Sequence, residues 1–190
     1  MVSILFLDVE GAFPNAVTKR LIHNLRKRRI PNAYITFIEK LLTGRRTKLK
    51  FNDFVSESIE ILNGIGQGNP LSMILYIMYN ADLLDIPENE EKEDALGYVD
   101  DVALIAVGKD FEETTARLEQ MMTRGEGGLQ WSRDHNSKFE VSKSVVLHAS
   151  RRTQPDPEND NKQIPLDWPH LVVQERRVKD VANFKSGNTN

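Results

Sequence analysis

The stretch that decides the fold is Ala95-Leu96-Gly97-Tyr98-Val99-Asp100-Asp101-Val102-Ala103-Leu104-Ile105-Ala106, residues 95–106. Its two adjacent acids lie between apolar flanks, although acidic residues are seldom buried unless they are paired or bound to a metal. We therefore predict two strands folded around Asp100 and Asp101. Both carboxylates would then lie at one end of a sheet, where they repel each other until a cation arrives. An exposed Asp-Asp turn without further role is the alternative.

A second acid, Asp8, ends the short apolar run Ile4-Leu5-Phe6-Leu7, which is typical of a buried strand. Two-metal phosphoryl transfer needs carboxylates that converge from separate strands on metals about 3.5–4 Å apart. Mg²⁺ prefers such oxygen ligands. Asp8, Asp100 and Asp101 are therefore candidate metal ligands, and the alternative for Asp8 is a cap or a turn residue.

The glycine-rich segment from Gly64 to Pro70 precedes a helix that we expect to begin at Pro70. Glycines let a backbone approach a ligand closely, and the Gln67 amide can donate and accept hydrogen bonds. A plain turn between a strand and a helix is the alternative. Other patterns predict a helix capped by Asn15, a helix with a core stripe over residues 34–41, a hairpin over residues 48–61 and a helix over residues 111–122. Helices and hairpins in this order favour an α+β domain.

The composition fits one globular domain. Its 190 residues are 39% apolar and 28% charged, which is enough for one core of useful size. Cysteine is absent, which excludes disulfides and cysteine-based zinc sites. No apolar run approaches the ~20 residues that span a membrane, and the chain does not open on a secretory signal. We therefore expect an intracellular protein with no membrane part.

The formal net charge of -3 conceals a segregation of charge. Residues 15–50 carry eleven Lys and Arg against one acid, whereas residues 82–94 carry seven acids against one lysine. The basic stretch predicts contacts to nucleic-acid phosphates. The candidate residues are Arg26, Lys27, Arg28, Arg29, Arg45 and Arg46. For residues 26–29 the alternative is a solvated helix end, where basic side chains suit the helix dipole.

Four segments, in this order, resemble the palm motifs of reverse transcriptases. They are Phe6-Leu7-Asp8-Val9-Glu10-Gly11-Ala12-Phe13, Gly66-Gln67-Gly68-Asn69-Pro70-Leu71-Ser72, Tyr98-Val99-Asp100-Asp101 and Asn136-Ser137-Lys138-Phe139-Glu140-Val141-Ser142-Lys143. The fourth has the form seen in non-long-terminal-repeat, LINE-like retrotransposons. The resemblance covers roughly residues 1–152. It implies a polymerase palm, in which helices cover one face of an antiparallel sheet.

The resemblance also implies roles for the matching residues. Asp8, Asp100 and Asp101, with the backbone of Val9, would hold Mg²⁺ or alternatively Mn²⁺. Lys143 would lie near the pyrophosphate leaving group, where a lysine can donate a proton, and a surface lysine is its alternative. Phe13 would be a steric gate against a ribose 2′-hydroxyl, and a core phenylalanine is its alternative. The nucleotide pocket would be lined by Val9, Glu10, Gly11, Ala12, Phe13, Gln67 and Gly68.

The implied partners are an RNA template, a DNA primer and deoxynucleoside triphosphates, in a nuclear or cytoplasmic ribonucleoprotein. The family's fingers and thumb are expected to be largely missing, and residues 153–190 are expected to be a linker and a degraded primer-grip-like tail, with Val181–Gly187 as its nearest match. We therefore expect a palm fragment that is inactive alone. A non-catalytic retrotransposon relic with residual nucleic-acid binding is one alternative. An RNA polymerase or a nucleotide cyclase with a palm is another, and Phe13 argues against RNA synthesis.

Overall fold

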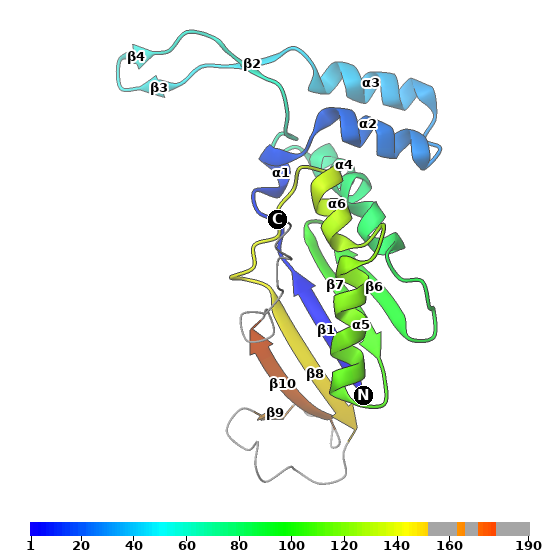
Figure 1. Cartoon of the computed structure of the whole chain (residues 1–190). Helices are drawn as coiled ribbons and strands as arrows, with labels where there is room; N and C mark the ends of the chain where they lie inside the picture. Colours follow the sequence, from blue (N-terminus) through cyan, green and yellow to red (C-terminus); the bar gives the residue numbers. More distant parts are fainter. Residues whose placement is uncertain (152–162, 166–170, 178–190) are drawn as a thin grey trace, which may run out of the picture.

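The computed structural model describes residues 1–151, 163–165 and 171–177, and its centre is a six-stranded sheet (Figure 1). The strands run in the order β6-β7-β1-β8-β10-β9, and every neighbouring pair is antiparallel. The bounds are β1 (Val2–Leu7), β6 (Glu93–Tyr98), β7 (Asp101–Val107), β8 (Val145–Arg151), β9 (Gln163–Pro165) and β10 (Leu171–Arg177). The strands predicted to end in Asp8 and to flank Asp100 and Asp101 are thus neighbours, which confirms that prediction.

Helices cover one face of this sheet. The helix α5 (Phe111–Thr123) packs on β1 and β7, and α6 (Gly128–Asp134) packs on α5 (Figure 1). The remaining helices are α1 (Ala12–Asn15), α2 (Thr18–Lys27), α3 (Asn32–Leu42), α4 (Pro70–Asn80) and the 3₁₀-helix η1 (Ala81–Asp85). They gather beside the end of β1, where α4 contacts α1, α2 and η1. The predicted α+β palm, with helices on one face, is confirmed.

The alternation of β1 explains which face is covered. Leu5 and Leu7 are buried, whereas the side chain of Phe6 is 44% exposed. Successive side chains of a strand point to opposite faces. Leu5 and Leu7 therefore belong to the face beneath α5, and Phe6 belongs to the opposite, open face. Leu96 lies in the same row as Phe6, because both pair with Ala103, and it is also exposed.

The hairpin predicted over residues 48–61 is present and projects from the body as an arm (Figure 1). At its base β2 (Arg45–Thr47) pairs with β5 (Ile59–Ile61), and at its tip β3 (Lys50–Phe51) pairs with β4 (Phe54–Val55). Asn52 has a φ of 47° in the turn. This is the left-handed region, which Asn tolerates better than most residues.

Two expectations need correction. Asn15 does not cap the helix at residues 18–27, because it is the last residue of α1, and Val17 precedes α2 instead. On α3 the predicted core stripe is largely exposed: Tyr34 and Phe37 face solvent, whereas Ile35, Ile38 and Leu42 are buried. The sheet also includes β9 and β10, which lie within residues 153–190, and the linker and primer-grip-like tail expected for that region stay a prediction. The expected linker at residues 155–160 and the primer-grip-like segment at residues 181–187 lie outside the described residues.

Candidate active site

The strand register brings the candidate carboxylates to one end of the sheet. Leu7 pairs with Val102, and Tyr98 pairs with Asp101 across the β6–β7 turn. One further step along β1 sets Asp8 opposite Asp101. By the same alternation that exposes Phe6, Asp8 and Asp101 point toward the open face of the sheet. Asp8 and the Asp100-Asp101 turn therefore lie at the ends of neighbouring strands.

The turn that carries Asp100 is strained. Val99 has a φ of 58°, which is unfavourable for a β-branched residue. The amide of Asn80, at the end of α4, donates to the Val99 carbonyl over 3.0 Å. Asn80 is itself 4% exposed. The helix thus holds the turn in its strained shape, and strain of this kind gathers at functional sites. Sequence reasoning missed Asn80, whose one signal was a polar residue on the buried face of an apolar helix.

A second segment brings Lys143 to Asp8. The Lys143 Nζ lies 3.2 Å from Asp8 Oδ2. Val9 forms a β-bridge with Phe139, and the Glu140 amide donates to the Asp8 carbonyl over 2.8 Å. Beyond this bridge, residues 141–143 form a turn. Lys143 thus lies beside the candidate ligand Asp8, and its expected place near the pyrophosphate leaving group stays a prediction.

The oxygens at this end of the sheet suit a divalent cation, and the ammonium of Lys143 already takes a cation's place on Asp8. They do not form a ready-made site. Within the part of the chain that the structure describes, no three His, Asp or Glu side chains are grouped so that they could hold a metal ion. Asp8, Asp100 and Asp101 would be the ligands, and the expected ligand role of the Val9 backbone stays a prediction.

The glycine-rich loop is fastened to the turn after Asp8. The Gly64 amide donates to the Ala16 carbonyl, and the Ile65 amide donates to the Phe13 carbonyl, each over 2.7 Å. Gln67 and Gly68 follow these two bonds directly in sequence, so the start of the loop that carries them is fixed beside Phe13. Both residues are exposed, and no described residue bonds to the Gln67 amide. Their nucleotide-binding role stays a prediction.

The expected triphosphate-binding turn is partly occupied. The Glu10 amide donates to the Lys138 carbonyl over 2.8 Å, so it is not available to a phosphate oxygen. Gly11 is exposed, with a φ of 56°, and Ala12 is buried at the start of α1. Any phosphate contact from this segment would come from Gly11 and the residues that follow it.

Phe13 has features of both roles considered for it, a steric gate and a core phenylalanine. Its ring is partly buried and packs on Tyr76 from α4, with the ring centroids 5.0 Å apart. Tyr76 is completely buried, and its hydroxyl has no hydrogen-bond partner among the described residues. Burial raises the pKa of Tyr76, and the neighbouring Tyr79 and Asp100 raise it further. Tyr76 therefore packs on the aromatic ring of the first motif, a contact that sequence reasoning missed.

The basic residues predicted to bind nucleic acid divide into two groups. Lys27 and Arg28 are engaged by acids, with Arg28 Nη2 2.7 Å from Asp85 Oδ2 and both residues 3.0 Å from Asp82 Oδ1. Although burial alone would raise the pKa of Asp82, these two cations lower it. The acidic stretch after α4 thus neutralises part of the basic stretch.

The guanidinium groups at the base of the arm are also engaged. Arg45 donates to the carbonyls of Leu42, Asn63 and Gly64, and Arg46 donates to the Ser58 hydroxyl. By contrast, Arg26 and Arg29 are exposed and have no ion-pair partner among the described residues. The predicted phosphate contacts therefore fall mainly on these two, and they stay a prediction.

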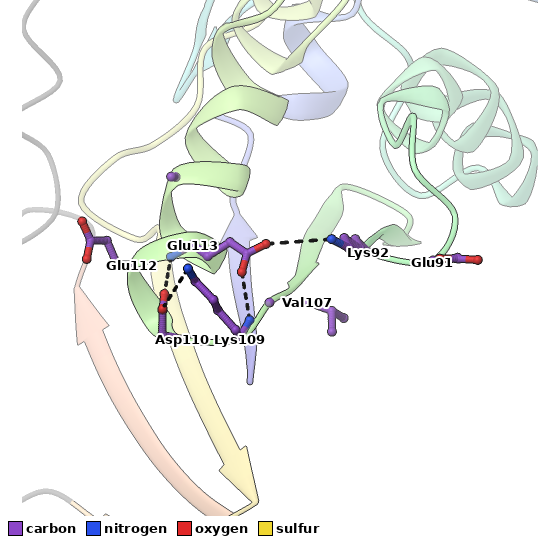
Figure 2. A pocket seen from close by; sticks show the side chains of 9 residues that line it. Glu91, Lys92, Val107, Lys109, Asp110, Glu112 and Glu113 are labelled. Atoms are coloured by element: carbon purple, nitrogen blue, oxygen red, sulfur yellow. Dashed lines mark hydrogen bonds and ion pairs between the residues drawn. The ribbon is translucent and has the colours of Figure 1, made fainter.

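An open pocket of about 840 Å³ lies at the far end of β7, beside Val107 and Gly108 (Figure 2). Some of its charged side chains pair with one another. Glu113 accepts from the Lys109 amide over 3.0 Å and lies 4.0 Å from Lys92 Nζ. Since Val107 and Asp101 are at opposite ends of β7, this pocket is separate from the candidate site.

Several known proteins are similar to this chain in sequence. The family model described as reverse transcriptase (RNA-dependent DNA polymerase) matches residues 2–177. A Pol polyprotein from the type-1 retrotransposable element R2 of Nasonia vitripennis is 31% identical over 67% of this chain, which is 12% of that protein's length. The RNA-directed DNA polymerase from the mobile element jockey of Drosophila melanogaster is 24% identical over 78% of this chain and 16% of its own length.

The fold is also that of solved telomerases. A structure of Candida tropicalis telomerase covers 87% of this chain with a TM-score of 0.59 at 11% identity, and the match takes up 27% of the telomerase. A second telomerase structure from that species covers 76% of this chain with a TM-score of 0.55 at 16% identity, and 30% of the telomerase. Among the described residues no helix is long and apolar enough to cross a membrane. With its family match over residues 2–177, this chain belongs to the reverse transcriptases, as a domain of the type found in LINE-like, non-long-terminal-repeat retrotransposons.

Proposed function

We propose that this chain forms the catalytic palm for RNA-directed DNA synthesis. Its substrates would be deoxynucleoside triphosphates, and its partners an RNA template and a DNA primer. The observation that carries the proposal is the convergence of two chain segments on one sheet end. Asp8 and the Asp100-Asp101 turn come from neighbouring strands, and Lys143 lies on Asp8.

In this proposal the three carboxylates bind Mg²⁺ or Mn²⁺. Two such ions would activate the attacking 3′-oxygen and neutralise charge on the leaving pyrophosphate. The chain's own contribution is placement: the Asn80 bond fixes the Asp100 turn, and the sheet register fixes Asp8. The open face beside Phe6, Leu96 and Tyr98, all exposed, leaves room for a primer end next to the carboxylates.

The chain by itself should bind metal without extending primers appreciably. Nucleotidyl transfer needs the triphosphate and the primer end in line, and a misplacement of about 1 Å can cost roughly 100-fold in rate. Three carboxylates cannot provide that alignment alone. The chain spans 12–16% of the length of the relatives reported above, and in them the remaining length is available for that task.

A chimaera tests the catalytic assignment directly. Residues 2–177 would replace the corresponding segment of the Nasonia vitripennis R2 protein, and primer extension would be measured on an RNA template. We expect metal-dependent extension that falls on the order of 100-fold or more in Asp8→Asn and Asp100→Asn, the scale seen when one transition-state stabiliser is removed.

The matched control is Asp53→Asn, which removes an exposed carboxylate at the tip of the arm and should leave extension unchanged. Extension that survives Asp100→Asn would contradict the proposal. A folded chimaera that binds RNA but never extends a primer would instead favour the non-catalytic relic.

A further inference from the structure

We propose that Lys143 is an internal cation that occupies Asp8 and must be displaced when a divalent metal binds there. This inference rests on the proposed function, because it takes Asp8 as a metal ligand. It concerns the site before substrate arrives, and it makes Lys143 a determinant of metal affinity.

Lys143 is the cation that pairs with the candidate carboxylates. Lys143 Nζ lies 3.2 Å from Asp8 Oδ2, and the two side chains are 66% and 34% exposed. No other described Lys, Arg or His pairs with Asp8, Asp100 or Asp101. Within residues 1–150, where side chains are described, Lys143 thus supplies the one ion pair of the candidate site.

Main-chain hydrogen bonds hold the turn that carries Lys143 next to Asp8. The Glu140 amide donates to the Asp8 carbonyl over 2.8 Å, and the Lys143 and Ser144 amides both donate to the Glu140 carbonyl over 3.1 Å. The turn that carries Lys143 is therefore hydrogen-bonded to the backbone of Asp8 itself. Because these bonds involve main-chain atoms alone, replacing the Lys143 side chain leaves the turn in place.

The consequence is competition for one oxygen. A magnesium ion binds a carboxylate oxygen at about 2.0–2.1 Å, and an ammonium group 3.2 Å from that oxygen would lie within a few Å of the metal. Two positive charges at such a distance repel strongly. The ion pair is accessible to water and correspondingly weak, so the metal can displace it, although with lower affinity than for a free carboxylate.

The test is a Mn²⁺ titration of the full chain at low ionic strength, in which electron paramagnetic resonance measures the concentration of free Mn²⁺. Lys143→Met should tighten Mn²⁺ binding roughly threefold to tenfold, since it removes a cation beside the site. Lys143→Arg keeps the charge and should stay within about twofold of the unaltered chain. Lys138→Met is the matched control, because Lys138 is an exposed lysine of the same segment with no ion pair among the described residues. It should also change binding by less than about twofold.

The outcomes separate this inference from the proposed function. Binding that is equal or weaker in Lys143→Met, and still lost in Asp8→Asn, would overturn the role of Lys143 while leaving the metal site intact. Equal tightening in Lys138→Met would reduce the effect to net charge and also overturn the inference. No Mn²⁺ binding by any variant would overturn the metal site itself, and the inference with it. Circular dichroism of each variant verifies that the sheet is retained.

Discussion

Single residues at the candidate site have an unfavourable backbone conformation or an unsatisfied buried polar group. Val99 keeps a left-handed backbone, and Tyr76 buries a hydroxyl without a partner among the described residues. The carboxylates could be predicted from the sequence, because an acid at the end of an apolar run is visible there. Asn80 and Tyr76 could not, since their importance depends on which turn α4 meets in the folded chain. Their helical spacing alone indicates only a buried face.

The buried hydroxyl of Tyr76 gives the first prediction. Tyr76→Phe should raise the free energy of unfolding by about 1 kcal/mol, because an unsatisfied buried hydroxyl is unfavourable. The measurement is the urea midpoint at constant slope. Tyr79→Phe is the matched control and should destabilise by about 1 kcal/mol, since the Tyr79 hydroxyl accepts from Val17 and donates to the His135 carbonyl. Destabilisation in Tyr76→Phe would mean that its hydroxyl is hydrogen-bonded in solution.

The half-buried ring of Phe13 gives the second prediction. In the R2 chimaera, Phe13→Val should reduce the preference for deoxynucleotides over ribonucleotides by on the order of 10–100-fold, because it opens space at the 2′ position. The measurement is the ratio of kcat/KM for the two sugars. Phe37→Val, at an exposed position on α3, should leave the ratio unchanged. An unaltered ratio in Phe13→Val would return Phe13 to a purely structural role.

At the scale of elements, the loop before α4 and the turn after β1 act as one unit. The start of α4 was predictable, because Pro70 opens the helix and Asn69 caps it through the Leu71 amide. The start of α2 was not, since Asn15 is used by α1 instead. Nor could the sequence show that residues 64–65 bond to residues 13–16, because such contacts depend on tertiary packing rather than on local pattern.

The third prediction tests that junction. Gly64 has a φ of +87°, and a Cβ there would lie 2.7 Å from the Pro14 carbonyl oxygen. Gly64→Ala should therefore destabilise the chain by about 2–4 kcal/mol, through both backbone strain and the clash. Gly66→Ala is the control, because a Cβ at Gly66 meets nothing within 4 Å, and it should change stability by less than about 0.5 kcal/mol. Equal effects in chemical denaturation would show that the loop is not fastened to the turn.

At the scale of the whole molecule, a buried polar cluster joins three helices beside the site. His135 is 1% exposed, its Nδ1 lies 3.0 Å from the Trp131 carbonyl, and its Nε2 lies 3.2 Å from the Asn24 amide nitrogen. The hydroxyl of Tyr79 donates to the His135 carbonyl. Thus α2, α4 and α6 are tied at one point. The sequence could predict α2 and α4, but it could not predict α6 or this junction.

The fourth prediction follows from the charge state of His135. Its pKa is lowered to about 4, chiefly by burial and also by nearby Arg20, against the opposing effects of the Trp131 carbonyl, Asp82 and Asp134. The unfolded chain, with a pKa near 6.5, binds a proton before the folded chain does, so stability falls as the pH falls from about 6.5 toward 4. The loss from this group should be on the order of 2 kcal/mol between pH 7 and pH 5.

Urea denaturation across this pH range measures the effect. His135→Gln should flatten the dependence, whereas His23→Gln, at an exposed position on α2, should leave it as it is. If stability in His135→Gln falls with pH as steeply as in the unaltered chain, another group is responsible for the dependence.

We propose above that Asp8, Asp100 and Asp101 hold one metal centre at the end of the sheet. The most direct measurement replaces Mg²⁺ with Fe²⁺ and uses ascorbate and peroxide, so that hydroxyl radicals formed at the metal cut the backbone nearby. We predict cuts close to Asp8 and in the turn at Val99–Asp101, competed by Mg²⁺ and lost in Asp8→Asn. Cuts confined to the acidic residues 88–94, or cuts that persist in Asp8→Asn, would contradict the account.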